Sequence, residues 1–429
     1  MTRVTVVGGG LAGSEAAWQL GIRGCPVDLF EMRPERSTPA HSSGYLAELV
    51  CSNSLGASGL DSAGGLLKEE LRQLGSMIMA CADRARVPAG GALAVDREKF
   101  AQGVTDKILG CPNIRVHREV WDRFPPKPAI IATGPLTEPG FAAALQAKFG
   151  RDMLFFYDAA SPIVEADSID KSRVFWASRY GKGGADYLNC PLDRQEYQDF
   201  YQALITAETV TLKDFEKESY FESCLPLEVL AKRGPETMRY GPLKPVGLVD
   251  PRTGQAPYAA VQLRRENVGG SLFNLVGFQT NLVWGEQKRV FRLIPGLEKA
   301  RFSRYGVMHR NSFINSPALL AENYQLKDYP GIYVAGQLSG VEGYLESTGS
   351  GLVAALSLWE GLRGGTFTLP RETLLGALAA YVCTGNINFQ PMNASFGLLP
   401  PIAEKLSKRA RRETYCQRSL KKLLFLSKN

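Results

Sequence analysis

The sequence contains few of the residues that build metal centres, disulfide scaffolds or membrane spans. Among its 429 residues are three His and eight Cys, and no two Cys have the Cys-x-x-Cys spacing. Thinly spread Cys argue against a zinc site, an iron–sulfur cluster or a disulfide framework. No apolar run reaches the roughly 18 residues of a membrane helix, and 374–383, the best candidate, is too short. Because no signal peptide precedes the first predicted strand, we predict a cytoplasmic protein with reduced Cys and no metal.

The composition is equally poor in signs of disorder or repeats. Hydrophobic residues make up 45% of the chain and charged residues 22%, which is ordinary for a globular enzyme. The length exceeds what a single core normally supports. We predict an α/β fold in which one nucleotide-binding domain is interrupted. Residues 1–150 form its first part, 151–319 an inserted mixed α/β domain, and 320–429 the completing part.

A βαβ unit is predicted at the start of the chain. The β-branched run 3–7 predicts a buried strand, 14–20 a helix and 26–30 a second strand. Further helices are predicted over 66–79, 97–109 and 351–361. Further strands are predicted over 114–117, 129–133 and 331–336. Strands alternating with helices in this way indicate a parallel sheet.

A glycine-rich turn joins the first strand to the first helix, and it has the spacing Gly-x-Gly-x-x-Gly. Gly8 permits the tight turn, Gly10 lets a pyrophosphate approach the backbone, and Gly13 lets the helix pack close to the sheet. Glu31 ends the second strand, where a carboxylate accepts hydrogen bonds from a ribose. A tight turn without a ligand is the alternative. The predicted phosphate loop consists of Gly8, Gly9, Gly10, Leu11, Ala12 and Gly13, with Glu31 beside it.

Later segments favour FAD over NAD as the resident dinucleotide. Glu15, the run 132–134 after a strand, and the run 348–351 opening a helix are typical of two-dinucleotide-domain flavoproteins. No second glycine motif follows a clear strand, so a nicotinamide reductant is expected to bind transiently. The predicted cofactor residues therefore also include Thr133, Gly134, Gly336, Gly349, Ser350 and Gly351.

Two Cys have distinctive neighbours. Cys51 lies in a short polar run, and Cys224 precedes a Pro that suggests a turn. Either residue can be a small buried hydrophobe, as most free Cys are, or a reactive thiol. His309 lies in a polar cluster, where it can stack on a ring or satisfy a turn carbonyl. The pattern of residues alone leaves these alternatives open.

A series of motifs from residue 4 to about residue 415 closely resembles the bacterial folate- and FAD-dependent tRNA uracil-5-methyltransferase (TrmFO) family, a relative of GidA-type flavoproteins. Besides the glycine loop, the motifs include Glu31-Met32-Arg33-Pro34, Thr38-Pro39-Ala40-His41, Cys51-Ser52-Asn53-Ser54, Phe221-Glu222-Ser223-Cys224-Leu225-Pro226, Gly277-Phe278-Gln279-Thr280-Asn281-Leu282, Tyr305-Gly306-Val307-Met308-His309-Arg310-Asn311 and Gly343-Tyr344-Leu345-Glu346-Ser347.

The resemblance implies that a one-carbon unit passes from methylenetetrahydrofolate to C5 of uridine 54 in the tRNA T-loop. It further implies that FAD supplies the hydride and that NAD(P)H regenerates the flavin. The family's paired catalytic Cys fall on Cys51 and Cys224, and its folate-stacking His falls on His309. The alternatives are GidA-type modification of a wobble uridine, a paralogue acting on ribosomal RNA, and a flavin- or RNA-binding protein without activity. GidA proteins carry a longer helical C-terminal domain that this sequence does not show.

Basic residues are the candidate contacts to tRNA, which we take as the macromolecular partner; no obligate protein partner is evident. The net charge is +7, and residues 404–429 hold nine Lys or Arg against two Glu, so this tail carries the whole surplus. The tail's basic residues recur at helical spacing and predict one basic face, with a solvated surface helix as the alternative. Outside the tail the candidates are Arg179, Lys182, Arg264, Arg265, Lys288 and Arg289.

Overall fold

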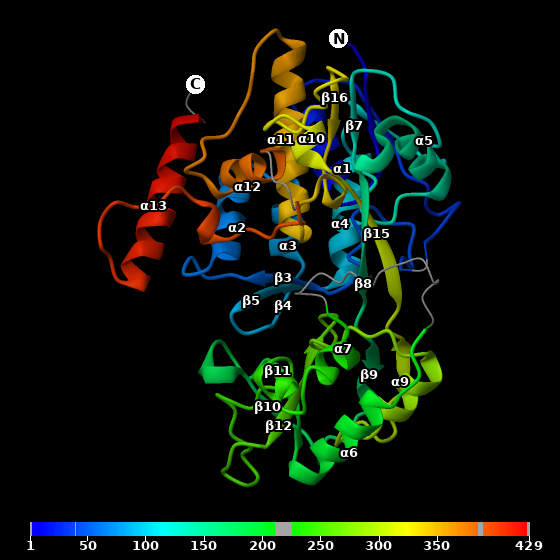
Figure 1. Ribbon diagram of the computed structural model, residues 1–429, viewed down its shortest axis with the longest axis vertical. Coiled ribbons are helices and arrows are strands. Elements are labelled where there is room, and N and C mark those ends of the chain that lie inside the picture. The colour runs from blue at the N-terminus through cyan, green and yellow to red at the C-terminus, as the bar shows by residue number, and fades with distance from the viewer. Residues whose placement is uncertain (1, 39, 211–224, 385–388, 427–429) are drawn as a thin grey trace.

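The computed structural model describes residues 2–38, 40–210, 225–384 and 389–426, which form two lobes (Figure 1). A five-stranded parallel sheet lies in the upper lobe of Figure 1. Most residues of its strands are buried, as is usual where helices cover a parallel sheet. In spatial order the strands are β16 (Ile332–Val334), β7 (Ala129–Ile131), β1 (Val4–Val7), β2 (Val27–Phe30) and β6 (Ile114–His117).

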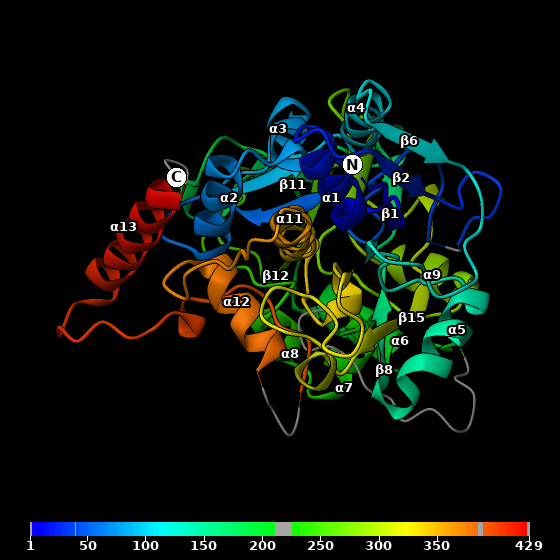
Figure 2. The same cartoon turned by 90° about the horizontal axis from the view of Figure 1, so that it is seen from above.

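Helices and a small antiparallel sheet complete this lobe. The helix that follows β1 packs against the long helix that follows β16, as the view from above shows (Figure 2). The helices are α1 (Leu11–Gly21), α2 (Ala63–Gln73), α3 (Met77–Arg84), α4 (Arg97–Leu109), α5 (Pro139–Phe149), α10 (Ser316–Leu319), α11 (Tyr344–Leu362), α12 (Leu374–Cys383) and α13 (Lys408–Leu426). The small sheet has the order β3 (Ser54–Ala57), β5 (Ala92–Val95), β4 (Arg86–Val87).

The second lobe is built around a six-stranded antiparallel sheet with its own hydrophobic cluster, drawn from residues 164–300. The strand order is β10 (Phe175–Ala177), β11 (Tyr187–Leu192), β12 (Ala259–Arg265), β13 (Leu272–Leu275), β9 (Ile163–Glu165), β14 (Phe302–Arg304). The helices here are α6 (Arg194–Ile205), α7 (Leu227–Lys232), α8 (Thr237–Tyr240) and α9 (Trp284–Phe291). Two antiparallel strands, β8 (Met153–Ala159) and β15 (Met308–Ile314), run between the lobes (Figure 1).

Two predicted helices differ from the structure. The predicted helix 66–79 is two helices, because Gly75 adopts a φ of +71° and the Ser76 side chain accepts a hydrogen bond from the Met79 amide, starting α3. The apolar positions stay in phase across this break, which is why periodicity missed it. The predicted helix 351–361 begins earlier, since α11 starts at Tyr344.

Candidate nucleotide site and cysteine site

The glycine loop has the backbone shape that a dinucleotide requires. Gly8 has a φ of +103°, and a Cβ there would lie 2.4 Å from the carbonyl oxygen of Ala132. A Cβ on Gly13 would lie 1.8 Å from the Gly8 carbonyl oxygen. At Gly10, by contrast, a Cβ would meet no protein atom within 4 Å. Gly8 and Gly13 are therefore needed for packing, whereas Gly10 borders open space.

That open space lies at the start of α1. Gly10 is the N-cap residue and no side chain caps the helix, so its first amides are available to a ligand. A helix start with uncapped amides attracts anionic phosphate. These features fit the pyrophosphate of a dinucleotide, which the loop residues 8–13 would hold.

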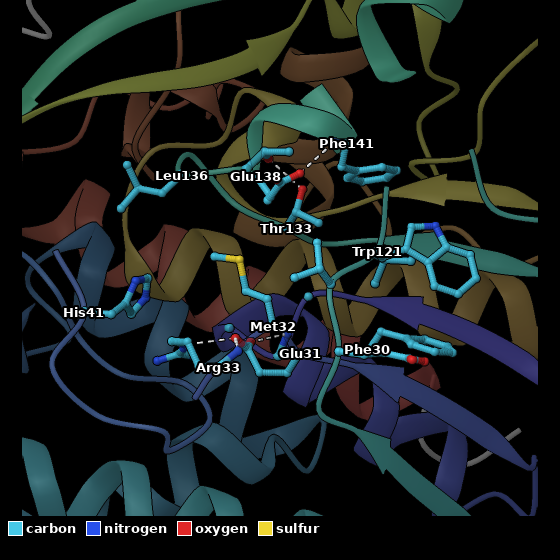
Figure 3. Close-up of a pocket in the computed structure, with 17 residues that line it drawn as sticks. Phe30, Glu31, Met32, Arg33, His41, Trp121, Thr133, Leu136, Glu138 and Phe141 are labelled. Carbon is cyan, nitrogen blue, oxygen red and sulfur yellow. Dashed lines mark hydrogen bonds and ion pairs between the residues drawn. The ribbon is translucent and has the colours of Figure 1, made fainter. Parts of the chain in front are cut away.

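A cavity extends from this loop past the end of β2 (Figure 3). Its walls combine the glycine loop with aromatic rings, and the ring of Phe30 lies 4.4 Å from that of Trp121, centroid to centroid. Such a wall suits a flat heterocycle attached to a ribose. The lining residues are Val7, Gly8, Gly9, Gly10, Phe30, Glu31, Met32, Arg33, His41, Glu119, Val120, Trp121, Thr133, Leu136, Thr137, Glu138 and Phe141.

Glu31 is fixed at the floor of the cavity. Its carboxylate accepts hydrogen bonds from the Gly9 amide at 2.9 Å, the Arg33 amide at 3.0 Å and the Arg33 Nε at 2.8 Å. Burial alone would raise the pKa of Glu31, but these bonds and the charge of Arg33 hold it below the usual value. A carboxylate has about four acceptor positions, so one remains for a ribose hydroxyl.

The other predicted cofactor residues divide into two groups. Thr133 lines the cavity, whereas Gly134 is absent from its wall and its carbonyl accepts a bond from Thr137. The remaining four, Gly336, Gly349, Ser350 and Gly351, lie together around α11.

The stretch 349–351 does not open a helix, contrary to the sequence prediction. All three residues are buried inside α11, and the Ser350 hydroxyl accepts a hydrogen bond from the Gly336 amide at 2.7 Å. A Cβ on Gly351 would lie 2.2 Å from the carbonyl oxygen of Ala12. These small residues let α11 approach α1, so their observed contacts serve packing beneath the glycine loop.

Glu15 also has a packing contact. It is fully buried and accepts hydrogen bonds from the Ser76 hydroxyl and the Ile78 amide, at 2.8 and 2.9 Å. The carboxylate therefore satisfies the start of α3 and ties it to α1. Burial raises the pKa of Glu15.

Cys51 lies where the two lobes meet. Its thiol sulfur is 3.8 Å from the carbonyl oxygen of Ala159, at the end of β8. The amides of Cys51 and Ser52 both donate to the hydroxyl oxygen of Tyr344, at 2.8 and 3.0 Å. Since Tyr344 is the first residue of α11, the Cys51 backbone is fixed to the start of that helix.

Three Arg side chains from three different elements surround the same loop. Arg97 donates to the Leu49 carbonyl at 2.6 Å, and Arg304 donates to the Val50 carbonyl at 2.6 Å. Arg264 donates to the Ser52 hydroxyl and to the Asn53 side-chain oxygen, both at 2.7 Å.

The three guanidinium groups interact electrostatically with Cys51. Burial lowers the pKa of Arg264 and Arg304, and the charge of a Cys51 thiolate opposes that shift. Burial, the largest single effect, would lower the pKa of Arg97, but the charge and hydrogen bond of Glu266, the charge of Tyr344 and the charge of a Cys51 thiolate together raise it. By the same Coulomb interactions the Arg side chains favour the thiolate, the nucleophilic form of Cys.

Cys51 is half-buried, unlike the other Cys that the structure describes. Cys25, Cys81, Cys111, Cys190, Cys383 and Cys416 are all buried. Burial raises the pKa of Cys81 and Cys416 to about 11 and that of Cys383 to about 12. Their interpretation as structural residues fits these positions.

Of two further predicted site residues, the structure describes the backbone of one and nothing of the other. Cys224 lies outside the described residues. The backbone of His309 belongs to β15, where it pairs with Asp158, and its side chain lies outside the described part. Two described residues that flank Cys224 in the chain bond to the same segment. The Leu227 amide donates to the Gln279 carbonyl at 2.7 Å, and the Val210 amide donates to the Asn281 carbonyl at 2.9 Å.

One of the predicted RNA contacts, Arg264, is wrong as a surface group, and another, Arg179, is bonded within the protein. Arg264 is 5% exposed and fully engaged with the Cys51 loop. Arg179 is half-buried and donates to the carbonyl oxygens of Pro242 and Lys244. Lys182, Lys288 and Arg289 are exposed, and Arg265 is half-buried with its guanidinium 4.8 Å above the Trp176 ring.

The basic tail forms α13, which is docked on the upper lobe. Tyr415, Cys416 and Leu423 are buried in the main hydrophobic cluster, and Ser419 donates to the buried carboxylate of Glu70. Lys405 precedes the helix. Lys408, Arg411 and Arg412 instead line a cleft whose other wall includes Lys182 and Asp61. Part of the tail is thus a structural helix and part a basic surface.

Sequence reasoning missed the residues that hold the two sites. Arg97, Tyr344 and Arg304 bear no spacing signal, since each acts through a contact with a distant segment, whereas Arg33 supports Glu31 from two residues further along the chain. Within the described ranges no group of His, Cys, Asp and Glu could hold a metal ion. A search of the same ranges found no helix that is both long and apolar enough to span a membrane.

Comparisons with known proteins place these features in a family. The family model described as Glucose inhibited division protein A matches residues 3–365. A methylenetetrahydrofolate–tRNA-(uracil-5-)-methyltransferase TrmFO from Heliobacterium modesticaldum is 58% identical over 99% of this chain and 98% of its own. The namesake from Bacillus pumilus is 54% identical over 99% of both chains.

A solved structure shows the same fold at much lower identity. Aquifex aeolicus GidA superimposes with a TM-score of 0.71 at 16% identity, covering 99% of this chain and 73% of that one. The predicted α/β, FAD-binding Rossmann-like (GidA-type) fold class is thereby confirmed. The chain belongs to the GidA family of proteins and, within it, to the TrmFO family of methylenetetrahydrofolate–tRNA-(uracil-5-)-methyltransferases.

Proposed function

We propose that this protein is a methylenetetrahydrofolate–tRNA-(uracil-5-)-methyltransferase that methylates uridine 54 of the tRNA T-loop. The observation that carries the proposal is the position of Cys51. It lies at the meeting of a dinucleotide-binding lobe and a second lobe, beside three cationic side chains. The names of its full-length relatives supply the substrate class.

The reaction explains why such a thiol is useful. Uracil C5 is a poor nucleophile, so a thiolate adds to C6 and generates an enolate that attacks the one-carbon unit. A second group then removes the C5 proton. We assign these two tasks to Cys51 and Cys224 as a pair. Arg97, Arg264 and Arg304 would support Cys51 in either task by stabilising negative charge on its thiol.

The FAD site is assigned to the glycine loop and its cavity. Gly8 to Gly10 and the uncapped start of α1 would hold the pyrophosphate, and Glu31 would accept a hydrogen bond from the ribose. When bound, FAD supplies the reducing equivalents that convert the transferred carbon into a methyl group. We propose NAD(P)H as the source of those equivalents and His309 as the residue that stacks on the folate.

The division into domains completes the proposal. We assign residues 1–150 and 320–429 to the FAD-binding domain and 151–319 to an inserted domain that faces tRNA. The separate hydrophobic cluster of residues 164–300 supports this division, and β8 and β15 are the connections. We place the protein in the cytoplasm, where its tRNA substrate is made, with no obligate protein partner.

The test is methylation of a T-arm transcript by purified, FAD-loaded protein. We expect transfer that requires both methylenetetrahydrofolate and NAD(P)H and that stops when uridine 54 is replaced. Cys224→Ala should abolish turnover while FAD stays bound. Methylation supported by S-adenosylmethionine alone would contradict the proposal.

Nucleosides from a deletion strain test the target independently. We expect 5-methyluridine to disappear from tRNA while ribosomal RNA is unchanged. Loss of a wobble-position modification would indicate GidA-type activity, and loss from ribosomal RNA a paralogue. An unchanged profile would favour a flavin- or RNA-binding protein without activity.

A further inference from the structure

A column of aromatic rings leads from the core of the second lobe to its surface. Trp284 stacks on Tyr305 with ring centroids 5.5 Å apart and planes 14° from parallel. Tyr305 stacks in turn on Phe302, at 5.3 Å and 18°. Phe302 contacts the fully buried Phe291. Trp284 ends the column with 62% of its surface exposed, the largest value among the five Trp.

The column is held rigidly by a buried amide. Gln287 of α9 is fully buried, and its side-chain oxygen accepts a bond from the Gly306 amide at 2.8 Å. Its side-chain nitrogen donates to the Gly306 carbonyl at 2.9 Å and to the Leu282 carbonyl at 2.8 Å. These bonds fix α9, which bears Trp284, against the segment that bears Tyr305. An exposed ring kept in one orientation loses little entropy when a ligand stacks on it.

The column is also connected to the cysteine site. Arg304, which precedes Tyr305 in the chain, donates to the Val50 carbonyl next to Cys51. On the other side, the Gly306–Val307 segment leads into β15, with the Val307 carbonyl accepting a bond from the Ala160 amide at 2.9 Å. The aromatic column and the Cys51 loop therefore both contact the short stretch of chain from Arg304 to Val307.

The charge around Trp284 suits a polyanion. Lys288 lies one helical turn further along α9, is exposed, and forms no ion pair among the described residues. Glu286, the acidic residue of this turn, is paired with Arg289 at 2.6 Å. A flat exposed ring beside an available cation is the combination that binds single-stranded nucleic acid by base stacking and phosphate contact.

We propose that Trp284 is a stacking platform for an unpaired base of the RNA substrate, with Lys288 contacting an adjacent phosphate. The inference rests on the proposed function, which requires the target uridine to leave its loop. Extruding that base exposes the faces of its neighbours, and aromatic side chains bind such faces. Trp284 is then a positioning residue for RNA.

The test compares two exposed Trp, one in α9 at the end of the aromatic column and one in an edge strand of the antiparallel sheet. Phe302, the base of the column, belongs to edge strand β14, and Trp176 belongs to the other edge strand, β10. Dissociation constants for a T-arm hairpin are measured with FAD-loaded wild-type protein and with Trp284→Ala, Trp284→Phe and Trp176→Ala. Circular dichroism and the rate of flavin reduction by NAD(P)H without RNA serve as folding and cofactor controls.

We expect Trp284→Ala to weaken RNA binding about tenfold, to raise KM more than it lowers kcat, and to leave flavin reduction unchanged. Trp284→Phe should recover most of the affinity, and Trp176→Ala should bind like wild type. Wild-type affinity in Trp284→Ala overturns the inference. A change in oligomeric state without a change in RNA affinity also overturns it, because a second copy of the chain would then cover the ring.

The outcome separates this inference from the proposed function. If wild-type protein binds the hairpin without methylating it, the proposed function is overturned, and the Trp284 comparison still tests whether this residue is a stacking platform. Methylation by wild type together with unchanged binding by Trp284→Ala removes the platform alone. Wild-type protein that does not bind the hairpin removes both.

Discussion

The glycine loop and the surroundings of Cys51 are built in opposite ways. In the loop, the turn, the helix start and the carboxylate of Glu31 all come from one short βαβ unit. Around Cys51, by contrast, the contacting groups come from α4, β12, β14 and α11. The loop is a local structure, and the cysteine site exists only when both lobes are in place.

Because of this difference, the two sites should respond differently to amino-acid substitutions. A change in the glycine loop should affect the dinucleotide and leave the Cys51 contacts intact. A change in either lobe should reach Cys51, because Arg264 belongs to the antiparallel sheet and Tyr344 to the parallel-sheet lobe. Under the proposed function, the cysteine site is therefore where tRNA binding by one lobe would be coupled to flavin chemistry in the other.

The largest expected effect comes from Cys51 itself. Cys51→Ala should reduce methylation by more than about 1,000-fold, because the loss of a covalent nucleophile or base is not replaced by its surroundings. FAD content, followed by visible absorbance, should remain at the wild-type level. Cys111→Ala, a change at a buried Cys, is the matched control and should retain activity. A near-normal rate in Cys51→Ala would return this residue to a structural role.

A second large effect is expected at Gly10, and it should be confined to the nucleotide. An added Cβ meets no protein atom, so Gly10→Ala should fold, but the methyl group occupies the space next to the helix start. We expect FAD affinity to fall at least tenfold, measured by flavin release on dilution. Gly269→Ala, where a Cβ also meets nothing within 4 Å, controls for the substitution. Equal FAD affinity in both variants would show that the pyrophosphate does not bind next to Gly10.

The same contrast explains what the sequence could predict. The glycine spacing and Glu31 describe one continuous unit, so pattern alone predicted the loop correctly as a strand–turn–helix unit with Glu31 beside it. The break between α2 and α3 escaped because Gly75 interrupts the helix without disturbing the apolar period. The start of α11 escaped because its first turn, which includes Tyr344 and Glu346, lacks an apolar stripe.

The cysteine site was beyond pattern reasoning for a physical reason. Its supporting groups are separated from Cys51 by up to 293 residues, so no local period records them. Arg264 shows the consequence, since a basic residue in a strand was assigned to the RNA surface and is in fact buried against Ser52 and Asn53. The family resemblance identified Cys51 as a candidate catalytic residue, but only the structure shows which side chains surround it.

Arg264 therefore offers a sharper test of the comparison, with an intermediate effect. Arg264→Gln should lower kcat by about 10- to 100-fold, because Ser52 and Asn53 lose a charged hydrogen-bond donor and the Cys51 loop loses a buried cation. Arg265→Gln removes the neighbouring, half-buried charge and should change kcat little. Single-turnover rates at saturating RNA measure both. Equal effects of the two variants would mean that Arg264 acts as a general surface charge.

A smaller effect is expected from the basic cleft on α13. Truncating residues 404–429 would be a poor test, because it uncovers Glu70 and removes Tyr415 and Leu423 from the core. Replacing Lys408 and Arg411 with Ala changes only side chains that line the cleft. We expect RNA affinity to fall several-fold and its salt dependence to become shallower, with FAD unaffected. Replacing Lys421, an exposed tail residue that is absent from the cleft wall, is the control; equal losses would indicate nonspecific charge.

The smallest expected effect is on acid stability, and it concerns His41 in the nucleotide cavity. Burial, and then the charge of Arg33, lower the pKa of His41 to about 4. An unfolded His titrates near 6.5, so the neutral ring contributes stability that is complete above that pH and is lost as the pH falls through about 4. His41→Gln, which cannot take up this proton, should therefore lose less unfolding free energy between pH 7.5 and pH 5. The difference should be about 1 kcal/mol, allowing for partial exposure of the ring. Urea unfolding at fixed, saturating FAD measures it. Parallel pH profiles for the two proteins would show that His41 is not held neutral in the folded protein.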